Sequence, residues 1–153
     1  MTYKDLSRKI LHELQNDGRL SLRELGEKFD VSPSTIGKRL EELREDGVLQ
    51  GITADIDYEK LGYAYVALIR FKVVGDSIDR ALELLGEHPQ LTDIYEITGN
   101  YDLLAVGHFR DRDHMNRIVK ALQGEEAIRE TNTSIILNAY RENGILPLFN
   151  HDS

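Results

Sequence analysis

The stretch SLRELGEKFDVSPSTIGKRLEELRED, residues 21–46, decides the fold of the N-terminal part of the chain. Two helices are predicted to begin within it. Ser21 followed three residues later by Glu24 forms a capping box, in which each residue satisfies a backbone N–H of the first turn. Ser32 is a favourable N-cap, and Pro33 suits the first helical position, where a missing N–H costs nothing. The stretch therefore predicts a short helix, a turn and a longer helix that ends before Gly47.

A further helix precedes this stretch, and an extended segment follows it. The pattern Thr2-Tyr3-Lys4-Asp5 predicts another N-cap, and Gly18 marks the end of that helix. Its apolar residues recur at helical spacing: Leu6, Ile10, Leu11 and Leu14. Residues 48–56 have the pattern of extended chain. Three short helices and a hairpin-like stretch predict a winged helix-turn-helix over residues 1–50, followed by a linker strand over residues 51–62.

From Tyr63 onward the apolar period changes from that of a helix to that of a strand. One strand face is expected to carry Tyr65, Ala67, Ile69, Phe71 and Val73, and the other Val66, Leu68, Arg70 and Lys72. The patterns that follow predict the order βαββαβ over residues 63–141, a ferredoxin-like arrangement with two helices on one face of an antiparallel sheet. Residues 142–153 are expected to form a tail. The fold class is therefore α+β.

The second face of that sheet needs a cover that the chain itself does not supply. A second copy of the chain can cover this face, and a closed two-fold dimer is the commonest form of such self-association. We therefore expect the protein to be a homo-oligomer.

The longer helix of the opening stretch shows the residue types that contact DNA. Its apolar stripe, Ile36, Leu40 and Leu43, is expected to face the core. The outward and flanking positions of its N-terminal half then carry Ser34, Lys38, Thr35 and Arg39. Arg19, Arg23 and Lys28 lie around the preceding turn and helix, where they suit phosphate contacts. The alternative is a solvated face, with Lys38 paired to Glu42 one turn on.

The loop Gly99-Asn100-Tyr101-Asp102 is the candidate small-molecule site. Glycine permits close backbone approach, a carboxylate accepts hydrogen bonds from an ammonium group, and tyrosine lines a pocket. The alternative is that these residues only connect two strands, with glycine and asparagine chosen for positive φ. The residues alone leave both interpretations open.

Several motifs resemble the Lrp/AsnC family of transcription regulators over essentially residues 3–140. The motifs are DLSRKIL at 5–11, DGR at 17–19, VSPSTI at 31–36, GVL at 47–49, GITA at 51–54 and TGNYDLL at 98–104. The resemblance implies a homodimer or a larger assembly of dimers, a tetramer or often an octamer, which binds promoter DNA and senses amino acids through its ligand-sensing (RAM) domain. It implies DNA contacts at Ser32, Ser34, Thr35, Lys38 and Arg39. Gly37 departs from the polar residue that relatives often carry.

The resemblance also implies an effector site at the contact between dimers. In the family the glycine-containing loop is joined there by polar residues near the last strand, which in this chain are Thr131, Thr133 and Ser134. Those three residues are equally compatible with ordinary strand positions, because threonine suits a pleated surface.

Composition limits the other functions. The net charge is −8, but residues 1–50 hold nine basic and ten acidic side chains, so most of the excess acid lies beyond them. The chain has no cysteine, and its longest apolar run, residues 63–69, is too short to cross a membrane. With no apolar signal region at the start, we expect a cytoplasmic protein. The histidines lack metal-ligand spacing, and no catalytic pattern is present, so neither a cofactor nor an enzyme is expected.

The sequence thus predicts a sequence-specific DNA-binding regulator of amino-acid-related genes, modulated by a small effector. One alternative is an architectural protein that bends DNA without a ligand. Another is an enzyme similar to the sirohaem decarboxylases, which share the architecture, although exposed Ser34, Lys38 and Arg39 argue against it.

Overall fold

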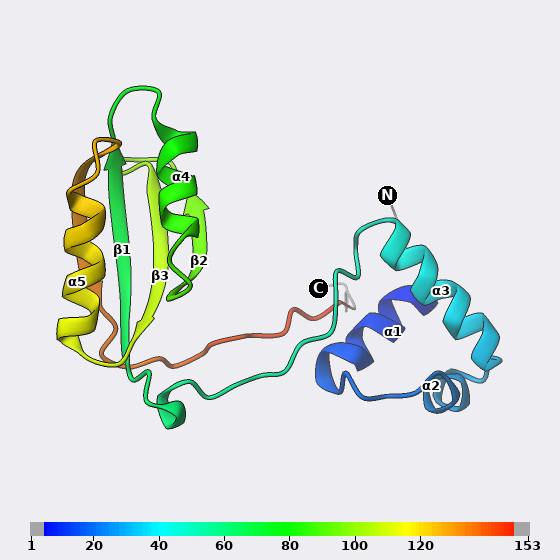
Figure 1. The fold of residues 1–153 in the computed structure, drawn as a ribbon. Coiled ribbons are helices and arrows are strands. Elements are labelled where there is room, and N and C mark those ends of the chain that lie inside the picture. The colour runs from blue at the N-terminus through cyan, green and yellow to red at the C-terminus, as the bar shows by residue number, and fades with distance from the viewer. Residues whose placement is uncertain (1–4, 149–153) are drawn as a thin grey trace. The chain divides into compact units, whose positions relative to one another are not determined.

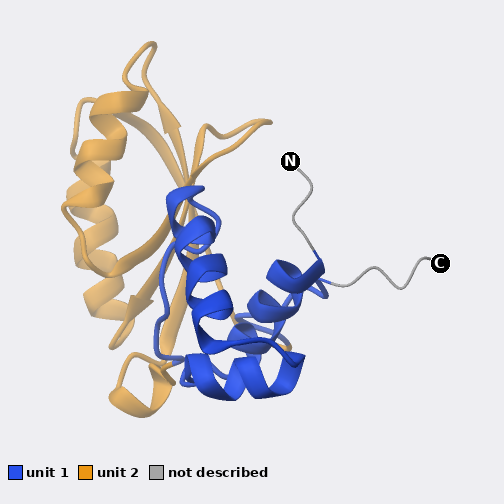
Figure 2. Ribbon diagram, turned by 90° about the vertical axis from the view of Figure 1, so that its right-hand side faces the viewer, with its two compact units in different colours: residues 1–55, 141–153 blue, residues 56–140 orange. Residues whose placement is uncertain are grey.

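The computed structural model describes residues 5–148, which form two compact units (Figure 2). The first unit comprises residues 1–55 and 141–153, and the second comprises residues 56–140. The N-cap expected at Thr2 lies outside the described residues, as do residues 149–153 of the expected tail.

The first unit contains the expected helices α1 (Asp5–Asn16), α2 (Leu22–Phe29) and α3 (Pro33–Glu45). The predicted caps at Ser21 and Ser32 are present, because each side chain accepts a hydrogen bond from the backbone N–H three residues on. The helices pack around a small core of apolar side chains from all three, namely Ile10, Leu14, Leu25, Ile36 and Leu40.

The linker differs from its prediction. Residues 46–64 contain no strand, and the only regular element there is the 3₁₀ turn η1 (Glu59–Leu61). A strand requires a neighbour for its backbone hydrogen bonds, and in the described part of this single chain none lies along residues 51–62. The expected linker strand and hairpin are therefore wrong for the chain on its own.

The second unit has the predicted βαββαβ order. Its elements are β1 (Tyr65–Val73), α4 (Ile78–Gly86), β2 (Leu91–Glu96), β3 (Leu103–Phe109), α5 (Arg112–Gln123) and β4 (Ile128–Ile135). The strands form one antiparallel sheet in the order β2-β3-β1-β4, and both helices cover the same face of it (Figure 1). This is the ferredoxin-like α+β fold expected from the sequence.

The two faces of the sheet separate as the alternation of β1 predicts. Ala67, Ile69, Phe71 and Val73 are buried against the helices, together with residues such as Leu85, Leu103, Phe109 and Leu122. We call the opposite side the open face. It carries Val66, Leu68, Arg70 and Lys72, all half-buried, with Val106 and Ser134 directly opposite Leu68 on the neighbouring strands.

The division into two units differs from the expected domain bounds in two places. Residues 56–62, expected as linker, belong to the unit that contains the sheet. Residue 141, expected in the βαββαβ domain, and residues 142–148, expected as tail, belong to the unit of α1, α2 and α3. None of the helices between residues 5 and 148 is long and apolar enough to cross a membrane.

Candidate functional site

The helix-turn-helix depends on a close contact between α2 and the turn before α3. Asp30 ends α2 in the left-handed conformation (φ 53°, ψ 47°), and its N–H donates to the carbonyl of Gly26. A Cβ atom added at Gly26 would lie 2.7 Å from the carbonyl oxygen of Val31, so only glycine fits. Sequence reasoning missed Gly26, although a glycine inside a helical pattern is a recognisable signal of close packing.

Three hydroxyl groups gather at the N-terminus of α3. The Ser32 Oγ accepts from the Thr35 N–H at 3.1 Å and lies 2.8 Å from the Thr35 Oγ1 and 2.9 Å from the Ser34 Oγ. Ser32 and Ser34 are exposed, and Thr35 is half-buried. The positive end of the helix dipole coincides with these groups, which makes this turn suitable for phosphate oxygens.

Lys38 and Arg39 differ although they are neighbours on α3. Lys38 is exposed, and among residues 5–148 it makes no ion pair. The side chain of Arg39 is only 21% exposed, and its Nη1 lies 2.6 Å from the Glu42 Oε2. Within residues 5–148 Lys38 forms no ion pair with Glu42, the pairing that the alternative expected, and Glu42 pairs with Arg39. Lys38 remains available for a phosphate or a base edge.

The other expected phosphate contacts lie around α2. Arg19 is exposed, and its backbone N–H donates to Asp17 at 2.9 Å. The Arg23 side chain is 82% exposed and pairs with Glu27 at 2.8 Å. Lys28 instead pairs with Glu13 of α1 and so links two helices. Arg19 and Arg23 thus keep the exposure that DNA contact requires, whereas Lys28 serves the packing of the unit.

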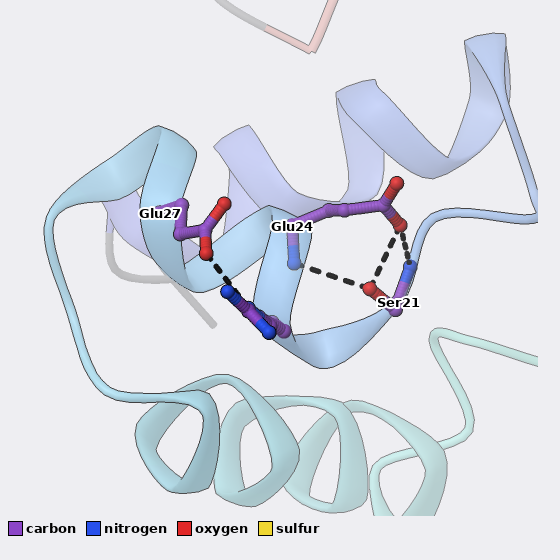
Figure 3. A network of polar contacts seen from close by, with 4 residues as sticks. Ser21, Glu24 and Glu27 are labelled. Carbon is purple, nitrogen blue, oxygen red and sulfur yellow. Dashed lines mark hydrogen bonds and ion pairs between the residues drawn. The ribbon is translucent and has the colours of Figure 1, made fainter.

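The capping box at the start of α2 holds this region in place (Figure 3). The Glu24 Oε2 accepts from the Ser21 N–H at 2.8 Å and from its hydroxyl at 2.7 Å. These hydrogen bonds stabilise the carboxylate and lower the pKa of Glu24 below its usual value.

In the second unit, the loop between β2 and β3 is fastened to β1 by Asp102. The Asp102 N–H donates to the carbonyl of Phe71 at 2.9 Å, and the Asp102 Oδ2 accepts from the Val73 N–H at 2.8 Å. Gly99 has φ +110°, which a side chain would strain. Gly99 thus has the positive φ that the alternative of a simple connection expected, whereas Asn100 does not. The second carboxylate oxygen of Asp102 makes no hydrogen bond within the described residues.

Tyr101 joins the same loop to the beginning of β4. Its hydroxyl donates to the Glu130 Oε1 at 3.0 Å, and this hydrogen bond, with smaller effects of burial and charge, raises the pKa of Tyr101. Glu130 lies opposite Lys72 across the strand pair. Sequence reasoning missed Glu130, because only the register of the sheet brings β4 to the end where the loop lies.

The three candidate residues on β4 do not lie together. Thr131 and Thr133 pair with Phe71 and Ile69, so they belong to the helix-covered face. Ser134 pairs with Leu68 and belongs to the open face, where the Arg70 Nη1 donates to the Ser134 Oγ at 3.1 Å. The same guanidinium donates to the Asn132 Oδ1 at 3.1 Å. Alternation along the strand separates the three, and only Thr131 is near the loop end of the sheet.

Asp102, bonded to Val73 at the end of β1, and Tyr101, bonded to Glu130 of β4, thus bring two carboxylates and a hydroxyl to the same end of the sheet. Such a group of acceptors suits an ammonium group, and the exposed backbone of Gly99 and Asn100 offers N–H groups for an anion. Together with the helix-turn-helix, this arrangement defines a class of protein: a DNA-binding transcription regulator with a separate ligand-binding domain.

Comparison with known proteins identifies the family. The family model described as the Lrp/AsnC ligand binding domain matches residues 66–146, and the model of a winged helix-turn-helix DNA-binding domain matches residues 4–50. A helix-turn-helix transcriptional regulator of Pyrococcus furiosus is 39% identical, over 93% of this chain and 96% of its own. The regulator FL11 of Pyrococcus horikoshii is 33% identical, over 94% and 95%. The chain belongs to the Lrp/AsnC family of transcription regulators.

Solved structures agree with this assignment. The structure of E. coli AsnC superposes with a TM-score of 0.88 at 27% identity, covering 95% of this chain and 99% of its own. A regulator of Neisseria meningitidis in complex with L-methionine also has a TM-score of 0.88, at 26% identity, covering 96% of this chain and 97% of its own. The fold predicted from the sequence is therefore confirmed, including the winged helix-turn-helix class of the first unit.

Proposed function

We propose that this protein regulates amino-acid-related genes by sequence-specific binding of α3 in the DNA major groove. The observation that carries the proposal is the exposed N-terminal half of α3, where Ser34 and Lys38 face outward and Lys38 has no ion pair among the described residues. The acidic residues of α3 lie further along the helix, at Glu41, Glu42 and Glu45. Insertion by the first turns keeps those carboxylates away from the phosphates, which agrees with the usual docking of a recognition helix.

Ser32, Thr35 and Arg39 complete the proposed contact surface on α3, and Arg19 and Arg23 hold phosphates beside it. Hydroxyl groups accept from and donate to base edges, whereas arginines that contact only phosphates set the register of the protein on the duplex. Arg39 can contact DNA only if its guanidinium leaves Glu42 for a phosphate, or binds the phosphate and Glu42 at the same time.

We further propose that the active species is a two-fold dimer formed through the open face of the sheet, or an assembly of such dimers. The face is apolar at its centre, with Leu68 and Val106 side by side, and has polar residues such as Lys72 and Glu130 at its end. This pattern of an apolar centre and a polar rim is typical of protein interfaces. A dimer presents two recognition helices, and operators for such proteins have half-sites about 34–36 Å apart.

For the effector we propose an amino acid, bound at a contact between dimers by the loop Gly99–Asp102, with Tyr101 and Asp102 as its side-chain contacts. The hydroxyl of Thr131 accepts a hydrogen bond from Gln123 on the helix-covered face, so Thr131, Thr133 and Ser134 enter this site only if their strand faces a neighbouring dimer. Two observations support an amino acid: the cluster of acceptors around Tyr101, and the L-methionine complexes of relatives from Neisseria meningitidis and M. tuberculosis. Binding shifts the spacing of the paired recognition helices and so changes operator affinity.

The DNA contact is tested by replacing Lys38 with alanine. We expect Lys38→Ala to weaken operator binding and to reduce the slope of log K against log salt by about 0.9 for each phosphate that the lysine neutralises in the wild type. Lys120→Ala on α5 removes the same charge from another exposed position and serves as the matched control. Equal operator affinity of the two variants would exclude α3 as the DNA-contacting helix.

Sequence specificity is tested by footprinting on genomic fragments. A few sharply protected sites agree with the proposal, whereas regularly phased protection along all fragments indicates an architectural protein.

A further inference from the structure

The chain does not end at the sheet. After β4 it passes through residues 136–140, where Leu137 and Tyr140 are 87% and 98% exposed. Residues 141–148 then belong to the compact unit that contains the helix-turn-helix (Figure 2). Within that stretch Ile145 is 46% exposed and Leu148 is half-buried. The DNA-binding unit is therefore built from both the N-terminal and the C-terminal parts of the chain.

A specific contact fixes this C-terminal stretch. The Asn143 Nδ2 donates to the Asp55 Oδ1 at 3.0 Å, across 88 residues of sequence. Asn143 has φ +49°, the left-handed conformation that asparagine tolerates better than most residues. The next residue is Gly144, where an added Cβ would lie 3.2 Å from the Arg141 Cδ, so the chain folds back on itself there. The Asn-Gly pair thus forms a turn that presents the asparagine side chain to Asp55.

Asp55 is itself connected to the helices. Three residues before it, Ile52 packs against the turn after α1, since a Cβ added at Gly18 would lie 2.6 Å from the Ile52 Cγ2. A residue that binds Asp55 therefore binds a part of the linker that is packed against the helix-turn-helix.

We infer that residues 141–148 form a strap that closes on the linker at Asp55 of the same chain, so that the DNA-binding unit is held at both ends. The segments 56–64 and 136–140 then both connect this unit to the sheet. A unit attached through two segments has fewer accessible orientations than a unit attached through one. It therefore loses less orientational entropy when it binds DNA. The strap accordingly strengthens operator binding, and this part of the inference rests on the proposed function.

The first test uses the absence of cysteine from the chain. In the double variant Asp55→Cys with Asn143→Cys, mild oxidation is expected to give an intrachain disulfide, seen as a faster-migrating monomer band without reductant. The control pair Asp55→Cys with Asn138→Cys, in which Asn138 lies before the strap, is expected to stay reduced. Failure of the first pair to cross-link, or its cross-linking only into covalent dimers, overturns the inference of a strap within one chain.

The second test compares Asn143→Asp with Asn138→Asp in the full chain. Both add one negative charge, but only the first removes the donor to Asp55 and places two carboxylates together. We expect Asn143→Asp to accelerate hydrogen exchange of the backbone amides in residues 52–55 and 141–148 by about tenfold, and to weaken operator binding by about threefold to tenfold. Asn138→Asp is expected to change neither.

The outcomes separate the strap from the proposed function. If the wild-type protein binds no operator, the proposed function fails, while cross-linking and hydrogen exchange still decide whether the strap exists. If the operator is bound but Asn143→Asp behaves like Asn138→Asp in both measurements, the strap inference fails and the proposed function stands.

Discussion

The carboxylate of Asp102 accepts a hydrogen bond from the backbone N–H of Val73 at 2.8 Å. This contact joins the loop that carries the candidate effector residues to the end of the central strand β1. One oxygen of Asp102 is thus committed to the fold, and the other makes no hydrogen bond within the described residues. A substitution at this position consequently tests two roles at once, unless the variant keeps the first oxygen.

Asp102→Asn separates the two roles. Its amide oxygen still accepts from the Val73 N–H, but the variant lacks the negative charge that an ammonium group requires. We expect Asp102→Asn to retain the stability of the wild type within about 0.5 kcal/mol and to abolish the response of operator binding to amino acids. Asp102→Ala should also lower the free energy of unfolding by about 1–3 kcal/mol, because it leaves the Val73 N–H without its partner. Amino-acid titrations of operator affinity and urea denaturation measure both effects, and an undiminished response in Asp102→Asn would place the effector elsewhere.

The two glycines of α2 and α3 are predicted to respond oppositely to alanine. At Gly37 a Cβ would lie 3.5 Å from the Leu22 Cδ1, an ordinary contact, so Gly37→Ala should stabilise the protein by about 0.5–1 kcal/mol through helix propensity. At Gly26 a Cβ would lie 2.7 Å from the Val31 carbonyl oxygen, so Gly26→Ala should destabilise it by about 1–3 kcal/mol. Urea denaturation followed by circular dichroism compares them. Similar shifts in the same direction would contradict the close turn.

The capping box predicts a pH dependence of stability. The pKa of Glu24 is lowered in the folded state by hydrogen bonds from the backbone and side chain of Ser21. The stabilisation it provides is therefore present above the unfolded pKa of 4.5 and is lost as the pH falls through the lower folded value. We expect the difference in free energy of unfolding between the wild type and Glu24→Ala to shrink as the pH falls below that range. A difference that stays constant from neutral to acidic pH would show that the charge of Glu24 has no part in the cap.

The open face predicts the effect of a single buried charge on assembly. Leu68 lies at the centre of that face, between Val106 and Ser134 on the neighbouring strands. We expect Leu68→Glu to produce monomers, because burying two symmetry-related carboxylates in an apolar interface is costly. Ala121→Glu, on the exposed side of α5, serves as the control. Analytical ultracentrifugation measures the masses, and a Leu68→Glu variant with the wild-type mass would rule out the open face as the dimer contact.

Much of the fold follows from short-range patterns in the sequence. The caps at Ser21 and Ser32, the stripe of Ile36, Leu40 and Leu43, and the alternation along residues 65–73 are all present in the structure. These features depend on contacts within one helix or one strand, so the residue spacing specifies them. The exposure of Lys38 was predictable for the same reason, because the period of the helix determines its face.

Only the tertiary structure decided which distant residues meet. The contact of Tyr101 with Glu130 depends on the register of β4 against β1. Residues 48–56 have the pattern of extended chain, yet no strand within residues 5–148 pairs with them. The hydrogen bond of Asn143 to Asp55 has no counterpart in any local pattern. Local spacing thus sets each element, whereas packing and register across the chain determine the sites those elements build.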